Sequence, residues 1–126
     1  MKKVAVIGVH VVGMHHWGGR ELRVGEIYFA RNEPLNPKDK NAVAVYSDTE
    51  CIIKRGYLCR EDALIISKLF EENLICDNCF LKPKGVAEKF KKHRGPLQRC
   101  NVGFFSAEEN INRIGEILHK YEMKVW

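Results

Sequence analysis

The stretch "ARNEPLNPKDKNAVAVY", residues 30–46, changes character halfway along. Residues 32–41 are polar and carry two prolines, which predicts a loop. Pro34 and Pro37 each restrict their own backbone and that of the preceding residue, so we expect this loop to be stiff. In the strand predicted over residues 42–46, Val43 and Val45 share one face. The stretch thus predicts a rigid polar bend that leads directly into a sheet.

The rest of the sequence predicts a mainly β fold of the α+β class. Residues 3–12 are rich in β-formers, with Gly8 marking a bulge or a close approach of another backbone. Residues 21–30 form a second strand that starts at residue 21 or after Gly25. Further strands are predicted at residues 51–58, which Gly56 interrupts, at 79–81 and at 100–105. The first connections are too short for crossover helices, which favours antiparallel pairing. A curled sheet or small barrel of about six strands would leave no open edge.

Two segments have the period of a helix. Residues 61–73 carry apolar side chains at helical spacing, and acidic residues at their start suit the positive end of the helix dipole. Ser106 and Glu109 have the spacing of a capping box, so we expect a C-terminal helix over residues 106–123. A length of 126 residues suits a single domain, 1–126.

The composition is that of a globular protein, with 45% hydrophobic and 29% charged residues. No apolar run approaches the roughly 18 residues of a membrane span, so we expect no membrane partner. The initial "MKKVAVIGV" has no small-residue cleavage site and predicts a strand, not a signal peptide. Five scattered cysteines suit a reducing compartment. We therefore expect an intracellular protein, nuclear in a eukaryote and cytoplasmic otherwise.

Positive charge is concentrated in one segment. The net charge is +5, but residues 82–99, "KPKGVAEKFKKHRGPLQR", hold seven Lys/Arg and one Glu, which leaves the remainder close to neutral. Such an asymmetry predicts a polyanionic partner, and nucleic acid is the usual one. We expect a basic loop over residues 82–99 in which Lys89, Lys91, Lys92 and Arg94 contact the phosphate backbone. The alternative is a solvated loop without a partner.

The motif in residues 30–46, followed by "RGYLCREDALIISKLFEENL" at residues 55–74, resembles the HIRAN domain family. The shared pattern is an acidic residue and Pro, then N-P-x-D-x-N-A and a strand, then Gly, an aromatic residue and Leu before a helix. The resemblance covers about residues 4–81. It implies a small OB-like or SH3-like β-barrel with a packed helix, and it implies nucleic-acid binding. In the best-understood member the domain captures the 3′-hydroxyl end of single-stranded DNA.

The resemblance and the chemistry of the side chains give the candidate contacts. Asp39 is an acceptor for a terminal hydroxyl, and its charge disfavours a continuing phosphate. Lys38 and Arg60 can neutralise phosphates, and Tyr57 can stack on a base. The predicted nucleic-acid contacts outside the basic loop are His10, Val11, Asn36, Lys38, Asp39, Asn41, Tyr57 and Arg60. The alternatives are that Asn36, Asp39 and Asn41 make only local turn bonds, that Tyr57 is half-buried and that Arg60 pairs with a surface carboxylate.

The sequence departs from the 3′-end-binding pattern at its aromatic positions. That pattern has aromatic residues after the glycine of the first strand and just before the loop aspartate. Here Val11 or Val12 and Lys38 occupy these positions, and His10 stands where an arginine is expected. Each lost base–aromatic stack removes about 1–3 kcal/mol. Candidate replacement rings are Trp17, next to His15 and His16, and Phe104 or Phe105, although the two phenylalanines suit the core better.

The remaining chemical signals are weak. Cys76 and Cys79 have a C-x-x-C spacing that His93 and Cys100 could complete to a zinc site, but no second such pair exists, and ordinary thiols are the simpler reading. No nucleophile elbow, phosphate-binding loop or paired metal-binding carboxylates are found. The helicase or nuclease modules that accompany this family do not fit in 126 residues. We predict a non-catalytic nucleic-acid-binding module without a cofactor that recognises a single-stranded DNA 3′ end. The alternative is a protein-interaction module that binds a peptide or acidic partner in the same groove.

Overall fold

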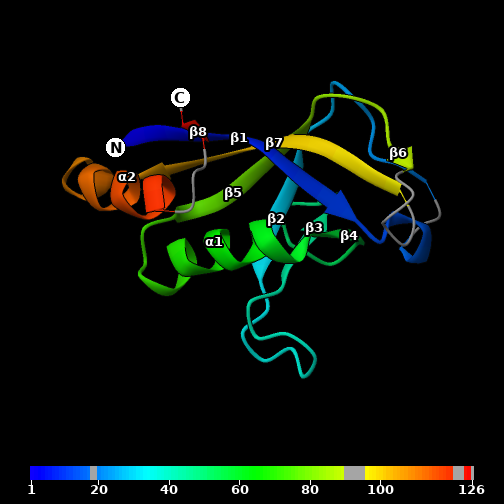
Figure 1. Cartoon of the computed structure of the whole chain (residues 1–126), viewed down its shortest axis with the longest axis horizontal. Helices are drawn as coiled ribbons and strands as arrows, with labels where there is room; N and C mark the ends of the chain where they lie inside the picture. The colour runs from blue at the N-terminus through cyan, green and yellow to red at the C-terminus, as the bar shows by residue number, and fades with distance from the viewer. Residues whose placement is uncertain (18–19, 90–95, 121–123, 126) are drawn as a thin grey trace.

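The computed structural model of the protein describes residues 1–17, 20–89, 96–120 and 124–125 (Figure 1). Within these ranges the chain forms strands, two α-helices and two short 3₁₀ turns. The strands are β1 Lys2–Val12, β2 Tyr28–Asn32, β3 Val43–Tyr46, β4 Lys54–Leu58, β5 Cys76–Pro83, β6 Glu88–Lys89, β7 Pro96–Ser106 and β8 Lys124–Val125. The helices are α1 Arg60–Glu71 and α2 Ile111–Lys120, and the 3₁₀ turns are η1 Met14–His16 and η2 Glu108–Asn110.

Six of the strands close into an antiparallel barrel. Neighbouring strands follow the order β7, β5, β2, β3, β4, β1, and β1 pairs back onto β7. The two-residue strands β6 and β8 are added on β7 and β1. Each pairing between the described strands is antiparallel. The predicted mainly β barrel of about six strands with two helices is therefore confirmed.

The bulge at Gly8 lets β1 serve two neighbours. β1 follows β7 along most of its length, and its last residues, Val11 and Val12, pair with Leu58 and Tyr57 of β4. The register with β7 shifts next to Gly8, which has a φ of 80°, a value that glycine adopts without strain. The predicted bulge is confirmed, and it bends the strand at the point where the barrel closes.

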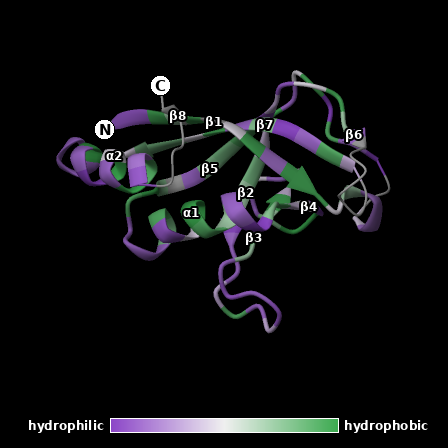
Figure 2. Cartoon of the chain, in the orientation of Figure 1, coloured by the Kyte–Doolittle hydropathy of each residue, from purple (hydrophilic) through white to green (hydrophobic). Residues whose placement is uncertain are grey.

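The core is built from the inward face of each strand. Along β7, the buried residues Cys100, Val102 and Phe104 alternate with more exposed ones, as expected for a barrel wall. Figure 2, coloured by hydropathy, shows hydrophobic and hydrophilic segments along the same helices and strands. α1 contacts β2, β3 and β4 as well as α2. Phe104 is fully buried, as predicted, whereas Phe105 lies on the outer face with 39% of its surface exposed, so the prediction that it belongs to the core is wrong.

Helix α1 has defined ends. Cys59 is its N-cap in an extended conformation, and two acidic residues, Glu61 and Asp62, lie in its first turn. The helix ends where Asn73 adopts a left-handed φ of 57° and Leu74 N bonds to Leu69 O at 2.9 Å. Neither described helix is long and apolar enough to cross a membrane.

Two predicted strands begin later than expected. β2 starts at Tyr28, and residues 21–27 are not in a strand, because Gly25 and the turn closed by Glu26 N and Arg23 O interrupt them. β4 starts at Lys54, because Asp48 accepts hydrogen bonds from the amides of Ile52 and Ile53 and folds residues 48–53 into a turn. β4 continues through Gly56, so the glycine does not end the strand, but the register of its pairing with β3 shifts beside Gly56, between the pairs Val45–Gly56 and Tyr46–Lys54.

The predicted basic loop and C-terminal helix also need correction. β5 extends to Pro83 and β7 begins at Pro96, so both ends of the 82–99 segment are strands. Ser106 is the buried last residue of β7, and its Oγ has no hydrogen-bond partner among the residues the structure describes, so it does not cap a helix. The turn η2 precedes α2, which begins at Ile111, and the predicted helix end at residues 121–123 lies outside the described residues.

Candidate nucleic-acid interface

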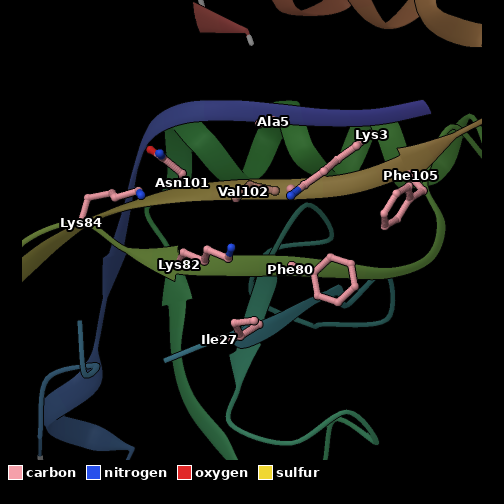
Figure 3. Close-up of a pocket in the computed structure, with 10 residues that line it drawn as sticks. Lys3, Ala5, Ile27, Phe80, Lys82, Lys84, Asn101, Val102 and Phe105 are labelled. Carbon is pink, nitrogen blue, oxygen red and sulfur yellow. The ribbon is translucent and has the colours of Figure 1, made fainter. Parts of the chain in front are cut away.

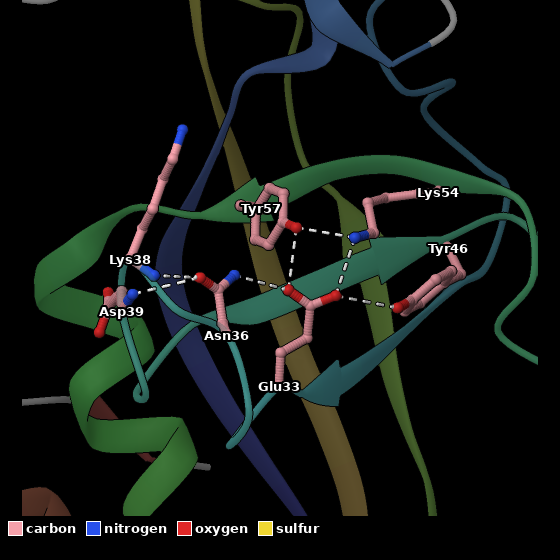
Figure 4. Close-up of polar contacts among 7 residues, drawn as sticks. All are labelled: Glu33, Asn36, Lys38, Asp39, Tyr46, Lys54 and Tyr57. Atoms are coloured by element: carbon pink, nitrogen blue, oxygen red, sulfur yellow. Dashed lines mark hydrogen bonds and ion pairs between the residues drawn. The ribbon is translucent and has the colours of Figure 1, made fainter.

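The loop between β2 and β3 is held in shape by its own side chains. Asn36 Oδ1 accepts hydrogen bonds from the backbone amides of Lys38 at 2.9 Å and Asp39 at 3.2 Å (Figure 4). Asp39 Oδ1 in turn accepts the amide of Asn41 at 2.9 Å. Together with the two prolines, these Asx-type bonds restrict the backbone of the bend. The bonds of Asn36 therefore stabilise the loop and leave its amide group little capacity for a ligand.

Glu33 joins the loop to the barrel wall. Its Oε2 accepts Lys54 Nζ at 2.8 Å, and its Oε1 accepts Tyr57 OH at 2.9 Å and Asn36 Nδ2 at 3.0 Å (Figure 4). Lys54 Nζ also donates to Tyr57 OH at 2.7 Å. The phenol of Tyr57 thus donates one bond and accepts another, so its ring position is fixed.

Both charges of this network are stabilised in their ionised form. Burial raises the pKa of Glu33, but the hydrogen bonds from Lys54, Asn36 and Tyr57 outweigh burial, so the pKa lies below its usual value. Burial lowers the pKa of Lys54, but its hydrogen bonds to Glu33 and Tyr57 outweigh that effect and raise the pKa above its usual value. The network is accordingly ionised at neutral pH.

Asp39 and Arg60 lie together at the surface. Arg60 Nε is 3.9 Å from Asp39 Oδ2, with 81% of the arginine side chain and 26% of the aspartate side chain exposed. Since Asp39 Oδ1 is occupied by the amide of Asn41, its Oδ2 is the oxygen that remains available to a ligand. Lys38 is also exposed, and Figure 4 shows its side chain extending away from the Glu33 network.

Trp17 supplies an aromatic ring next to Tyr57. The ring centroids are 6.2 Å apart in an edge-on arrangement, and Lys54 Nζ lies 4.8 Å from the centroid of each ring. Trp17 is 38% exposed and directly follows η1. Of the replacement rings considered from sequence, Trp17 is the one that contacts a predicted site residue.

Three further residues predicted to contact nucleic acid, Val11, His10 and Asn41, lie in different environments. Val11 is fully buried in the core, so we withdraw it as a nucleic-acid contact. The amide of His10 donates to Asp62 Oδ2 at 2.8 Å, and 40% of the His10 side chain is exposed. Asn41 Oδ1 accepts Ser67 Oγ at 3.5 Å, which connects the loop to α1.

The basic segment does not lie beside the loop over the part that the structure describes. In Figure 1 the loop between β2 and β3 projects from the lower side of the barrel, whereas β6 lies at the upper right. The backbone of Lys89 belongs to β6. The remaining predicted basic contacts, Lys91, Lys92 and Arg94, lie outside the described residues. The described part of the basic segment, residues 82–89, therefore does not form one continuous surface with the loop between β2 and β3.

Two residues of the network were missed in the sequence. Glu33 precedes Pro34 at the acidic position of the motif, but nothing in the sequence around it indicates a partner for its carboxylate. Its partner Lys54 lies 21 residues away, and only the pairing of β2, β3 and β4 brings the two together. Composition and spacing give no signal for such a pair.

Within the described residues, the cysteines are not grouped with other ligands as a metal centre would require. Cys79 and Cys100 are buried, and burial raises the pKa of each thiol to about 12, while Cys76 is half-buried. Over the described part of the chain, no three His, Cys, Asp or Glu side chains are grouped to hold a metal ion. His93, the fourth ligand considered from sequence, lies outside that part.

Comparisons with known proteins give the same family as the sequence motif. The family model of the HIRAN domain matches residues 4–88. The Fanconi-associated nuclease 1 homolog of Oryza sativa subsp. japonica is 31% identical over 97 residues, which are 75% of this chain but 10% of that protein. The chain thus spans about a tenth of the length of this curated relative.

Solved structures support the fold. The crystal structure of the HIRAN domain of human HLTF matches with a TM-score of 0.73 and 21% identity, covering 98% of this chain and 96% of that one. Its NMR structure matches with a TM-score of 0.69 and 24% identity, over 95% and 89% of the two chains. A protein from Lactobacillus plantarum matches with a TM-score of 0.53 and 19% identity, over 82% and 98%. Because the family model covers more than half of the sequence, the chain belongs to the HIRAN domain family.

Proposed function

We propose that this HIRAN domain binds a single strand of DNA and recognises its 3′ end. The binding surface, called the loop site below, consists of Trp17, Lys38, Asp39, Tyr57 and Arg60. The observation that carries the proposal is the Asp39–Arg60 pair, with Oδ2 and Nε 3.9 Å apart. Asp39 lies on the loop that Asn36 and Glu33 hold in place, and Arg60 is the first residue of α1. Family membership supports the proposal, since the resemblance implies capture of a 3′-hydroxyl end.

A carboxylate beside a guanidinium suits a strand end. Asp39 Oδ2 accepts the terminal 3′-hydroxyl, and Arg60 neutralises the last phosphate of the strand. A strand that continues beyond this point places a phosphate against Asp39, where the two negative charges repel each other. The site therefore selects an end over an internal position.

The aromatic rings supply the contact with the bases. A base stacked on Trp17 gains about 1–3 kcal/mol, and the gain does not depend strongly on sequence. Trp17 thereby takes over the role of the rings that are replaced by Val11 or Val12 and by Lys38. Tyr57 positions Trp17 through their edge-on contact and through the shared contact with Lys54.

Fluorescence anisotropy with short labelled oligonucleotides tests this proposal. A 3′-hydroxyl oligonucleotide is expected to bind more tightly than the same oligonucleotide with a 3′-phosphate, and Asp39→Asn is expected to remove this difference. Arg60→Glu is expected to weaken binding at least about tenfold. It is also expected to make the slope of log affinity against log salt concentration shallower by the contribution of about one phosphate contact. The matched control is Lys68→Glu, the same charge change on the same helix, roughly 12 Å further along.

Two results would contradict the proposal. Equal binding of free and blocked 3′ ends would remove the role of Asp39. Equal effects of Arg60→Glu and Lys68→Glu would remove the role of Arg60. A shallow salt response would favour the protein-interaction alternative, in which the same surface binds a peptide.

The proposal concerns binding and not catalysis. The rice relative carries the name of a nuclease, but this chain matches only 10% of its length. The loop site offers one carboxylate beside an arginine and no described cluster able to hold a metal ion. We therefore propose a non-catalytic role for the domain.

A further inference from the structure

A second surface lies on the outer side of the barrel, across β1, β7 and β5. Its cavity of about 400 Å³ includes none of the residues of the loop site. We call it the outer groove and define it by the side chains that rise around it, namely Lys3, Phe80, Lys82, Lys84, Asn101 and Phe105 (Figure 3). Its volume lies within the range of about 300–1,000 Å³ that is typical of sites for small molecules.

The groove exists because two small residues form its floor. Gly103 of β7 pairs with Ala5 of β1 on one side and with Phe80 of β5 on the other. A Cβ atom at Gly103 would lie 3.8 Å from Lys3 Cε, which is an ordinary contact. The position could therefore carry a side chain, and its being glycine keeps the groove open.

Aromatic rings line one end of the groove. Phe80 and Phe105 meet edge to face, with ring centroids 6.3 Å apart and planes at 88°. Phe80 also contacts Phe29, with centroids 5.8 Å apart. Phe105 and Ile27 are 39% and 49% exposed. These rings form an exposed apolar platform fixed to the sheet.

Uncompensated positive charge surrounds the platform. Lys3, Lys82 and Lys84 make no ion pair within the described part of the chain, and no acidic residue lines the groove. Asn101 uses its Oδ1 to accept the amide of Gly8 at 3.3 Å, and its Nδ2 donates to no other described residue. The polar groups that face the groove are therefore available hydrogen-bond donors.

We propose that the outer groove binds an internal segment of single-stranded nucleic acid, with bases on the Phe80–Phe105 platform and phosphates on Lys3, Lys82 and Lys84. The inference rests on the proposed function and extends it to a second surface. Base stacking on aromatic rings and neutralisation of phosphates by lysine are the two components of binding to single strands. An acidic peptide would use the lysines but would gain little from flat rings, so the platform favours nucleic acid.

The test separates the two surfaces by oligonucleotide length. The first probe is a four-nucleotide oligothymidine with a free 3′ end, which occupies only the loop site. The second is a 20-nucleotide oligothymidine blocked by a 3′-phosphate, which depends on the outer groove. Lys82→Glu is expected to weaken binding of the long probe at least about fivefold and to leave the short probe unchanged. Lys68→Glu, the same charge change on α1, is expected to leave the affinity for the long probe within about twofold of wild type.

Gly103→Val provides a variant that fills the groove without removing charge. Valine favours a strand, and its first carbon has room at this position, so the thermal unfolding midpoint is expected to stay close to that of the wild type. Binding of the long probe is expected to fall about tenfold, because the side chain covers the floor between the rings and the lysines.

Each outcome decides one of the two proposals. If Lys82→Glu and Gly103→Val bind the long probe as the wild type does, the outer groove is not a nucleic-acid site. If the two variants lose the long probe while the short probe binds alike with free and blocked 3′ ends, the groove stands and the end-recognition proposal fails. If oligoglutamate of equal charge displaces the long probe at the same concentration as unlabelled oligothymidine, the groove takes any polyanion and the assignment to nucleic acid is overturned.

Discussion

The loop site and the outer groove both combine positive charge with aromatic rings, but they hold their charges in opposite ways. Beneath the loop site, Lys54 donates hydrogen bonds to Glu33 and Tyr57, so its charge is neutralised by Glu33 and stabilises the shape of the surface. In the outer groove, Lys82 and Lys84 have no acidic partner among the described residues. A compensated network gives a fixed shape and hence selectivity, whereas uncompensated lysines give affinity that depends on salt. The difference suggests one surface that selects an end and another that holds the strand.

Gly56, next to Tyr57 of the loop site, and Gly103, on the floor of the outer groove, differ in the space available for a side chain. A Cβ at Gly56 would lie 2.8 Å from Val12 O and 3.1 Å from Val11 Cγ1, at the seam where β4 meets β1. Gly56→Ala is therefore expected to lower the free energy of unfolding by about 2–3 kcal/mol through overpacking. Gly103→Ala, with its nearest contacts at 3.8 Å, is the control and is expected to change the free energy of unfolding by less than about 0.5 kcal/mol. Urea unfolding that gave equal losses for both variants would contradict this account of the seam.

The Glu33 network is expected to be the next most sensitive feature. Glu33→Gln leaves Lys54, whose side chain is 20% exposed, without its anionic partner, and we expect a loss of about 2 kcal/mol in the free energy of unfolding. The control is Glu108→Gln, which removes the exposed pair with Lys2 and is expected to cost less than about 0.5 kcal/mol. Similar costs for the two variants in urea unfolding would show that the network does not stabilise the loop site.

Two equally exposed aromatic rings distinguish the surfaces in binding. Trp17 is 38% exposed and Phe105 is 39% exposed, so truncating either removes a similar amount of accessible ring. Trp17→Ala is expected to lower the affinity for the four-nucleotide probe about tenfold, which is about 1.4 kcal/mol of binding free energy. Phe105→Ala is expected to leave the affinity for this probe unchanged. For the blocked 20-nucleotide probe the order is expected to reverse. An equal response of both probes to both variants would mean that the surfaces are not separate.

The smallest effect is expected in the pH dependence of stability. The pKa of Glu33 is lowered from 4.5 in the folded state, so its contribution is complete above pH 4.5 and is lost as the pH falls through the folded pKa. The difference in free energy of unfolding between wild type and Glu33→Gln is therefore expected to narrow between about pH 5 and pH 3. A difference that stayed constant over this range would contradict the assigned ionisation of Glu33.

Local patterns predicted much of the barrel. The strand at Val43–Tyr46 and the glycine at the β1 bulge both depend on near neighbours in sequence, and both are confirmed. The two faces of that strand do not differ in exposure, because all four of its residues are buried. The first residues of β7 were missed because Gln98 is polar. In the structure Gln98 is fully buried and bonds to Leu22 through Nε2 at 2.7 Å and Oε1 at 2.8 Å. A buried glutamine satisfied by a distant backbone cannot be distinguished from a loop residue by composition.

The two surfaces also differ in whether their residues lie close together in the sequence. Lys38, Asp39 and Arg60 occupy a motif of about 30 residues, so the resemblance could identify them. The outer groove combines Lys3, Phe80 and Gly103 from three strands that lie far apart in the sequence, and no window of the sequence contains them together. The charge count placed the basic patch in residues 82–99, but it could not show that Lys82 and Lys84 line a groove that has aromatic rings at its other end.

The central claim is that the end and the body of a strand bind to different faces of one barrel, and amide chemical-shift mapping by NMR tests it most directly. The four-nucleotide probe with a free 3′ end is expected to shift the amides of Asp39, Asn41 and Arg60 and to leave those of Lys82 and Gly103 in place. The blocked 20-nucleotide probe is expected to shift Lys82 and Gly103 instead. Shifts at the same set of amides with both probes, or no shifts around Asp39 with the free 3′ end, would contradict the claim.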